Sequence, residues 1–331
     1  MRAAIVGAGL MGRSHADAVR KAGHHVSVIV DPDERRARAL AAKHGRARVA
    51  SLLGDVIDQR LADVAHICTP LESHERDTAL ALHGGMHAIV EKPVAESAAA
   101  TGRLIALASV AGLLVVPVHQ FLFQRGFLAL QRALPSAGPL LHIDAVACTF
   151  GAEGLDARGR DQVAIDILPH ALSIVARLTQ RSLATPEWTV LHGGAGELRI
   201  VASVGTTTVN IVVSTSGRPA VNMLRVVTAS RSFDLDLFHG YGSSTRGARS
   251  RQSKLAQPFV ASGRKVLAAG SNLLVRAARR EYAYPGLREL IARTYAAAAQ
   301  GSASPISAGE MMDVACVRDI VRDALSRQNL P

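Results

Sequence analysis

The sequence is poor in cysteine, aromatic residues and lysine, and these shortages narrow the class of protein. Its three cysteines, Cys68, Cys148 and Cys316, are odd in number and far apart, so they predict neither a disulfide framework nor a bound metal. A chain without disulfides fits a reducing compartment, and we expect a cytoplasmic protein.

Basic residues exceed acidic ones, but the pattern that marks nucleic-acid-binding proteins is missing. The net charge is +11, whereas aromatic residues make up only 4% of the chain and no stripe of basic and aromatic side chains occurs. We therefore predict no nucleic-acid partner. Attraction to anionic substrates or cofactor phosphates stays open.

Long apolar runs are also absent. The longest, from Leu104 to Val118, is too short to span a bilayer and contains Gly112 and Pro117, so we predict no membrane span. The N-terminus resembles a signal peptide in having Arg2 before an apolar run, but cleavage would destroy the first predicted strand. The 331 residues, 48% of them hydrophobic, suffice for two globular domains.

A glycine-rich turn follows the first apolar run, Ala3 to Val6, and precedes a helical pattern. The turn has the spacing G-x-G-x-x-G and contains Gly7, Gly9, Leu10, Met11 and Gly12. A turn of this kind between a strand and a helix places a dinucleotide's pyrophosphate at the helix N-terminus. The sequence thus predicts a dinucleotide site near its start.

Asp31 ends the second apolar run, at about the 20-residue distance that the dinucleotide fingerprint requires. A carboxylate there accepts hydrogen bonds from the ribose hydroxyls and repels a 2′-phosphate, which favours NAD. Arg35 and Arg36 follow it and could hold a phosphate instead, although solvated arginines on a helix face explain them equally well. We predict NAD as cofactor, with NADP possible.

Strands and helices alternate through the first 118 residues. Strands are predicted near 2–7, 25–30, 47–50, 63–68, 87–91 and 113–118, and helices near 10–22, 33–44, 51–58, 73–84 and 97–111. This alternation predicts an α/β fold with a doubly wound parallel sheet. Ligands bind at the carboxyl edge of such a sheet.

Two of these strands end in residues suited to the nicotinamide half of the cofactor. The fourth ends at Cys68-Thr69-Pro70, and His74 opens the following helix. A helix cap at Thr69 and a first-turn proline at Pro70 are the structural alternatives. The fifth ends at Glu91-Lys92-Pro93, where a substrate oxygen would need a hydrogen-bond donor.

Lys92 is one of only five lysines, against 33 arginines. Arginine keeps its proton in proteins, whereas lysine can release one when its surroundings shift its pKa. A lysine retained at a strand end in such a chain favours a chemical role over that of an ordinary surface residue.

Together, GAGLMG, Asp31, Cys68-Thr69-Pro70 with His74, and Glu91-Lys92-Pro93 resemble the Gfo/Idh/MocA family of oxidoreductases. The resemblance covers the first 120 residues closely and continues loosely beyond them. It implies cofactor contacts from the glycine turn and from both strand ends, Glu91 and Lys92 included. It also implies a polar residue after the sixth strand that contacts cofactor or substrate, and Gln120 matches that position.

The second half changes character. After a helix near 124–134, strands are predicted near 140–150, 187–192, 197–204, 207–215, 221–228 and 231–238. Strands without intervening helices predict an open, mostly antiparallel sheet. We expect a nucleotide domain at 1–119 and a substrate domain at 120–331, with a homodimer or homotetramer formed through this sheet. The family further implies that the last helix, about 307–327, packs back toward the first domain.

Asp166 and His170 are four residues apart and share a helix face. Pro169 is tolerated near a helix start, so we predict that the helix begins around 166–168. Taken singly, an N-cap aspartate and a core histidine would be ordinary. Together they resemble the family's D-x-x-x-H pair, which in the family faces the lysine. Arg158-Gly159-Arg160 before the pair and Ser173 after it depart from the family pattern and put the usual sugar-hydroxyl contacts in doubt.

Residues 239–257 are rich in glycine, serine and basic residues without period, which predicts a mobile loop. A basic amphipathic helix is predicted at 258–282, interrupted at Gly263 and Gly270. It could contact a membrane surface, but a subunit or domain contact or a plain surface helix explains it better.

The predicted function is hydride transfer between NAD and a carbinol or carbonyl carbon of a sugar, nucleotide sugar or cyclitol. His170 would act as general base, Asp166 would orient it, and Lys92 would stabilise the substrate oxygen. Two alternatives stay open: transient use of NAD in an epimerisation or elimination, and a non-catalytic NAD-binding protein.

Overall fold

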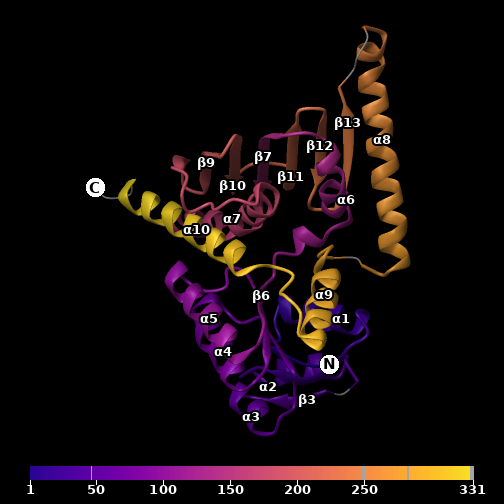
Figure 1. Ribbon diagram of the computed structural model, residues 1–331. Helices are drawn as coiled ribbons and strands as arrows, with labels where there is room; N and C mark the ends of the chain where they lie inside the picture. The colour runs from indigo at the N-terminus through magenta and orange to yellow at the C-terminus, as the bar shows by residue number, and fades with distance from the viewer. Residues whose placement is uncertain (46, 248–250, 282, 329–331) are drawn as a thin grey trace. The chain divides into compact units, whose positions relative to one another are not determined.

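The computed structural model describes residues 1–45, 47–247, 251–281 and 283–328, which divide into two compact units (Figure 1). The first unit comprises Met1–Gln120 and Leu287–Ala315, and the second comprises Phe121–Gly286 and Cys316–Pro331. The boundary after residue 119 and the packing of the last helix stay predictions.

The first unit contains a six-stranded parallel sheet in the order β3-β2-β1-β4-β5-β6. Its strands are β1 (Arg2–Val6), β2 (His25–Val30), β3 (Arg48–Ala50), β4 (Val64–Ile67), β5 (His87–Val90) and β6 (Val115–Pro117). The order reverses between β1 and β4, which is the point where doubly wound sheets bind ligands. The predicted α/β fold is confirmed.

Helices cover both faces of this sheet, with α4 and α5 on one side and α1 and α9 on the other (Figure 1). The helices of this unit are α1 (Leu10–Lys21), α2 (Glu34–Ala41), α3 (Leu53–Asp58), α4 (Leu71–His83), α5 (Ala98–Ala111), α9 (Leu287–Gln300) and the start of α10 (Ala308–Gln328). Because both faces are covered, the central strands are buried except for Arg2 at the start of β1.

The core of this sheet is a row of isoleucines with one polar interruption. Ile5 lies in register with Ile29 on one side and with His66 on the other, and His66 lies in register with Ile89. All four side chains are fully buried. A histidine in this row needs hydrogen-bond partners, because an unsatisfied buried polar group costs stability.

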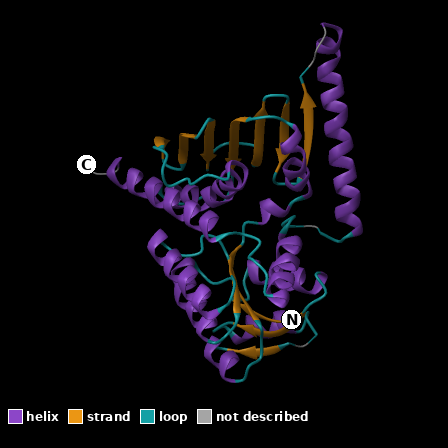
Figure 2. Ribbon diagram, in the orientation of Figure 1, coloured by secondary structure: helices purple, strands orange, loops and turns teal. Residues whose placement is uncertain are grey.

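The second unit contains a seven-stranded sheet in the order β13-β12-β11-β7-β10-β9-β8 (Figure 2). Its strands are β7 (Leu140–Cys148), β8 (Thr189–Gly194), β9 (Glu197–Val204), β10 (Thr207–Ser214), β11 (Val221–Thr228), β12 (Arg231–Asp236) and β13 (Tyr241–Arg246). The central pair β7 and β10 is parallel and the other pairs are antiparallel, which confirms a mostly antiparallel sheet.

The helices α6 (Arg125–Ala133) and α7 (Ala157–Thr179) pack on this sheet, as does α8 (Arg251–Ala278) along β13, and short 3-10 turns lie at Gln120–Phe123 and Leu134–Ser136. Burial alternates along β9 and β11, as expected for a sheet with one covered face. Leu141, Leu191 and Met223 are about half exposed, with fractions of 45%, 51% and 45%. Among the described helices, none is both long and apolar enough to cross a membrane.

The predicted start of the helix that carries Asp166 was wrong. The helix α7 begins at Ala157, and Pro169 lies inside it. Its true start is marked by Asp156, whose side chain accepts the Gly159 backbone N–H at 2.8 Å. An interior proline removes one helical hydrogen bond, at a cost of about 3 kcal/mol. The burial of many α7 side chains against the sheet offsets that loss.

The predicted loop at 239–257 was also wrong for most of its length. Tyr241–Arg246 forms β13, which pairs with β12, and α8 (Arg251–Ala278) follows; residues 248–250 lie outside the described residues. A strand made mostly of glycine, serine and threonine has no apolar alternation, so only its backbone pairing reveals it. The helix α8 continues through Gly263 and Gly270 without the predicted interruption.

Candidate active site

The backbone conformation of the glycine turn and its close contacts leave no room for a side chain at Gly7 or Gly12. Gly7 has φ +97°, and a Cβ atom added there would lie 2.6 Å from the Cys68 carbonyl oxygen. At Gly12 an added Cβ would lie 1.8 Å from the Gly7 carbonyl oxygen. These two glycines are therefore required for the chain to fold back on β1 and β4, with or without a ligand.

Gly9 differs, because an added Cβ there meets nothing within 4 Å. It is the N-cap of α1, and no described side chain caps the helix. The first backbone N–H groups of α1 thus keep the capacity to bind an anion, which fits a pyrophosphate. Leu10 beside it is 69% exposed and Met11 is half-buried.

Asp31, directly after β2, forms hydrogen bonds to the same turn. Its carboxylate accepts the Ala8 backbone N–H at 2.7 Å and the Asp33 backbone N–H at 2.8 Å. The side chain is only 8% exposed. Each carboxylate oxygen has a second lone pair, so these bonds leave the acceptor capacity that a ribose requires.

His74 joins the loops that follow β4 and β5. Its Nδ1 lies 2.8 Å from the Pro93 carbonyl oxygen and its Nε2 lies 2.8 Å from the Thr69 carbonyl oxygen. Carbonyl oxygens only accept, so the ring donates to both loops when both nitrogens carry hydrogen. Thr69 does not cap a helix: its hydroxyl donates to Asp77 at 3.2 Å, and Pro70 occupies the N-cap position of α4.

Lys92 is half-buried at the end of β5, and its bond to Pro93 is cis. The Lys92 backbone N–H donates to Glu91 Oε2 at 3.2 Å. Glu91 is 8% exposed, so this carboxylate lies beneath the turn rather than in solvent. The structure therefore fixes the Lys92 backbone from inside the domain.

A buried chain of hydrogen bonds continues inward from Glu91. Glu91 Oε1 lies 3.0 Å from His15 Nε2, His15 Nδ1 lies 2.8 Å from His66 Nδ1, and His66 Nε2 lies 2.8 Å from the Tyr295 hydroxyl. Burial lowers the pKa of His66 well below its usual value and raises the pKa of Tyr295. Both groups are thus neutral near pH 7.

With Glu91 ionised, one proton order satisfies every member of this hydrogen-bond chain. The Tyr295 hydroxyl donates to His66, His66 donates to His15, and His15 donates to an ionised Glu91. Each imidazole then carries one hydrogen. The tautomer of each ring is set by its neighbour, and the chain connects α9 to the Lys92 turn.

Gln120 is the last residue of the first segment of the first unit. It is 7% exposed, and its Oε1 atom is buried without a hydrogen-bond partner among the described residues. A buried amide oxygen without a partner costs stability, so this position fits a residue that contacts a ligand.

In the second unit, Asp166 and His170 lie one turn apart on α7, both half-buried. Asp166 Oδ1 accepts from Gln162 Nε2 at 3.0 Å and pairs with Arg318 at 3.3 Å. Arg318 is only 3% exposed. The His170 ring contacts the Phe121 ring, with centroids 4.5 Å apart and the two planes tilted by 30°.

The structure thus groups the glycine turn with Asp31, and the Thr69 loop with the Lys92 turn through His74. Lys92 belongs to the first unit, whereas Asp166 and His170 belong to the second. The predicted roles of all these residues stay predictions.

Sequence reasoning missed His15, His66, Tyr295 and Arg318. His66 had a signal, because a polar residue inside a buried parallel strand is unusual. Arg318 had a weaker signal: it lies among the apolar residues Val317, Ile320 and Val321 of a predicted helix. Tyr295 had none, as its partner is 229 positions away.

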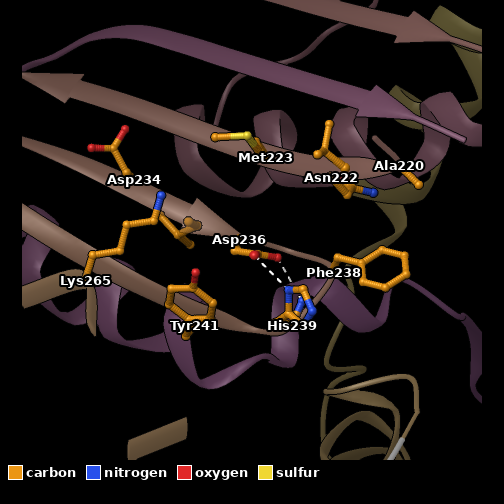
Figure 3. A pocket seen from close by; sticks show the side chains of 11 residues that line it. Ala220, Asn222, Met223, Asp234, Asp236, Phe238, His239, Tyr241 and Lys265 are labelled. Carbon is orange, nitrogen blue, oxygen red and sulfur yellow. Dashed lines mark hydrogen bonds and ion pairs between the residues drawn. The ribbon is translucent and has the colours of Figure 1, made fainter. Parts of the chain in front are cut away.

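A small cavity of about 110 Å³ lies elsewhere in the second unit, between strands β11 to β13 and α8 (Figure 3). Its described lining includes none of the predicted site residues. Asp236 Oδ2 lies 2.8 Å from His239 Nδ1 there, and Lys265 extends into the cavity from α8.

The comparisons with known proteins agree with this geometry. A family model described as an oxidoreductase family with an NAD-binding Rossmann fold matches residues 1–119. Residues 1–119 therefore match the Gfo/Idh/MocA oxidoreductase family, as the sequence motifs predict. The NAD-binding description of this family confirms the predicted cofactor class.

Curated relatives that match this part of the chain include dehydrogenases. Inositol 2-dehydrogenase of Corynebacterium glutamicum (strain R) is 33% identical over 109 residues, which cover 32% of this chain and 32% of that protein. The match to this relative thus spans about a third of its length. UDP-N-acetylglucosamine 3-dehydrogenase of Acidithiobacillus ferrooxidans is 24% identical over 265 residues, or 72% of this chain and 75% of that protein.

Solved structures share the fold over nearly the whole chain. The Acidithiobacillus ferrooxidans enzyme gives a TM-score of 0.76 at 18% identity and covers 98% of this chain and 97% of its own. Levoglucosan dehydrogenase, solved with NADH and levoglucosan, gives 0.79 at 14% identity, with 99% and 98% covered. Beyond residue 119, these structures show that the chain shares their fold and nothing more.

Proposed function

We propose that this chain is an NAD(P)-dependent dehydrogenase that acts on a CH–OH group of a small polyol or sugar-like substrate. The observation that carries the proposal is the Glu91-Lys92-Pro93 turn at the carboxyl edge of an NAD-binding sheet. A half-buried lysine held there from below by Glu91 suits an oxygen of the substrate.

The residues of the first unit fit the cofactor. The uncapped N-terminus of α1 and the open space at Gly9 would receive the pyrophosphate, and Asp31 would accept from the ribose hydroxyls. We propose NAD rather than NADP, because the Asp31 carboxylate would repel a 2′-phosphate. The side chains of Thr69, Pro70, Gln120 and Lys92 would complete the site.

When bound, NAD supplies the acceptor for a hydride from the carbinol carbon. Lys92 would donate a hydrogen bond to the substrate oxygen and stabilise its developing negative charge. His170 would remove the hydroxyl proton, because a neutral imidazole nitrogen can accept a proton. In the reduction direction His170 returns the proton.

Asp166 would stabilise the protonated His170. Its carboxylate oxygen Oδ1 lies 3.3 Å from the guanidinium of the buried Arg318. We propose that Arg318 and Gln162 together hold the Asp166 side chain in place.

The relatives set the range of substrates to test. Their names specify inositol, UDP-N-acetylglucosamine and levoglucosan, all of which carry secondary hydroxyl groups. We propose the same class here without choosing among its members, because the residues around Asp166 depart from the family pattern.

The test is the absorbance of NADH across a panel of cyclitols, sugars, nucleotide sugars and their keto forms, in both directions. A stoichiometric change with one class supports the proposal. Substrate consumption without net NADH change would replace it with transient redox in an epimerisation or elimination. Tight NAD binding without turnover of any panel member would identify a non-catalytic protein.

We further propose that the second unit's sheet mediates assembly, as the resemblance implies. The half-exposed Leu141, Leu191 and Met223 on its strands support this role.

A further inference from the structure

The helix α8 exposes an unusually long apolar face. It packs along β13 on one side (Figure 1), where Asn272 is buried. Large apolar side chains with exposed fractions between 49% and 82% lie along the rest of its length: Leu255, Phe259, Val260, Val266, Leu267, Leu273 and Leu274. Contiguous apolar surface of this extent marks an interaction site.

Apart from Leu255, these residues follow a strict seven-residue repeat. Small residues occupy every seventh position, at Ala256, Gly263, Gly270 and Ala277. Large apolar residues lie three and four positions after each of the first three. A sustained seven-residue apolar repeat is the pattern of a helix that packs against another helix in a left-handed supercoil. We call this face the α8 seam.

No contact within the described chain requires the two seam positions to be glycine. A Cβ atom added at Gly263 or Gly270 meets nothing within 4 Å. Each glycine destabilises the helix by about 0.5–1 kcal/mol relative to alanine. Close approach of a second helix backbone would give both positions a function, since a side chain there would keep the two helices apart.

Charged residues lie off the seam. Arg264 donates to the Ser244 carbonyl oxygen and Arg276 donates to the His239 carbonyl oxygen, so both point toward β13 and its turn. Lys265 lines the cavity on the same side (Figure 3). An interfacial membrane helix places its basic residues along the polar face to meet lipid headgroups. Here these residues contact their own unit instead, so a helix is the better partner than a bilayer.

The seam also complements itself. Its pattern reads the same in both directions about the midpoint between Val266 and Leu267. An antiparallel pair would place Gly263 opposite Gly270 of the partner, without like charges in contact. The exposed seam side chains present on the order of 1,000 Å² per copy, so a pair reaches the roughly 1,600 Å² of a stable interface. We propose that α8 pairs antiparallel with α8 of a second copy.

The first test is the mass of the full chain by sedimentation velocity at micromolar concentration. Leu267→Glu should halve the mass of the assembly, because two carboxylates would meet at the seam centre. Ser271→Glu, exposed on the same helix but off the seam, should leave the mass unchanged. Both positions are exposed in one copy, so folding survives either change. A monomeric wild type, or equal masses for wild type and Leu267→Glu, would overturn the proposal.

The second test fixes the orientation. Val266→Cys should give a disulfide-linked dimer on oxidation, whereas Ala256→Cys should not, because an antiparallel pair separates the two copies of that residue by about 32 Å at 1.5 Å per residue. The unmodified chain, with its three native cysteines, is the control. If the Ala256→Cys variant cross-links and the Val266→Cys variant does not, the antiparallel pair is contradicted. A monomeric chain that binds anionic vesicles, and loses that binding with Leu267→Glu, would also contradict it.

Discussion

The two units hold their predicted site residues by different means. In the first unit, Lys92 and the glycine turn lie in loops at strand ends, and buried backbone and side-chain hydrogen bonds fix those loops from beneath. In the second, Asp166 and His170 lie on one continuous helix and contact other side chains. We infer that the backbone fixes the predicted cofactor-binding residues of the first unit. The predicted substrate-binding residues of the second unit can instead change by side-chain substitution.

The largest expected effect separates chemistry from cofactor binding. His170→Ala should lower kcat/KM by about 10²–10⁴-fold, because it removes the general base. NAD affinity should stay within about twofold, since His170 belongs to the second unit. Asp166→Asn, which keeps the shape of the side chain, should have a smaller effect on kcat/KM. Steady-state kinetics and NAD titration measure both quantities, and normal turnover by His170→Ala would exclude its predicted role.

Two glycines of the first unit separate the stability of the fold from NAD binding. Gly12→Ala should lower the free energy of unfolding by several kcal/mol, because its Cβ would overlap the Gly7 carbonyl oxygen. Gly9→Ala should leave the melting temperature unchanged but weaken NAD binding by about tenfold or more, since only the ligand approaches that position. If Gly9→Ala bound NAD normally, the pyrophosphate would not lie at the start of α1.

The buried histidines predict how stability depends on pH. The pKa of His66 is lowered by burial and by its neighbours His15 and His24, so below about pH 6.5 the unfolded chain binds a proton that the folded chain does not. Stability should therefore fall as pH drops from 7 to 5, by up to about 1.4 kcal/mol per pH unit for this group. In urea unfolding at both pH values, His66→Gln should flatten the slope, whereas His25→Gln at the surface should not.

The smallest effect concerns the far end of the hydrogen-bond chain. Tyr295→Phe removes the hydroxyl 2.8 Å from His66 Nε2 and leaves that nitrogen buried without its partner. The expected loss is about 1–2 kcal/mol in the free energy of unfolding at pH 7. An unchanged urea midpoint would show that this bond contributes nothing to the stability of the first unit.

The sequence predicted the first unit well because its signals are local. Apolar runs, glycine spacing and strand ends all act within about 30 residues, the length of a βαβ unit. The second unit's sheet was predicted in class, but β13 escaped because a polar strand pairs only through its backbone. The start of α7 was misplaced because packing against the sheet outweighed Pro169.

The candidate site was predictable only in part. Gly7, Gly12 and Asp31 show their structural reasons in the backbone contacts of one short segment. The partners that hold Lys92 and Asp166 do not, because His15, Tyr295 and Arg318 lie tens to hundreds of positions away. Local patterns identify residue types, whereas tertiary contacts decide how each is positioned.

The most direct test of the account is Lys92→Ala beside Lys43→Ala, compared for NAD affinity and for NADH formation with the substrate that the panel identifies. Lys43 is an exposed residue after α2. We predict that Lys92→Ala binds NAD within a few-fold of wild type and loses at least about 10²-fold in kcat, while Lys43→Ala behaves as wild type. Wild-type turnover by Lys92→Ala would contradict the account.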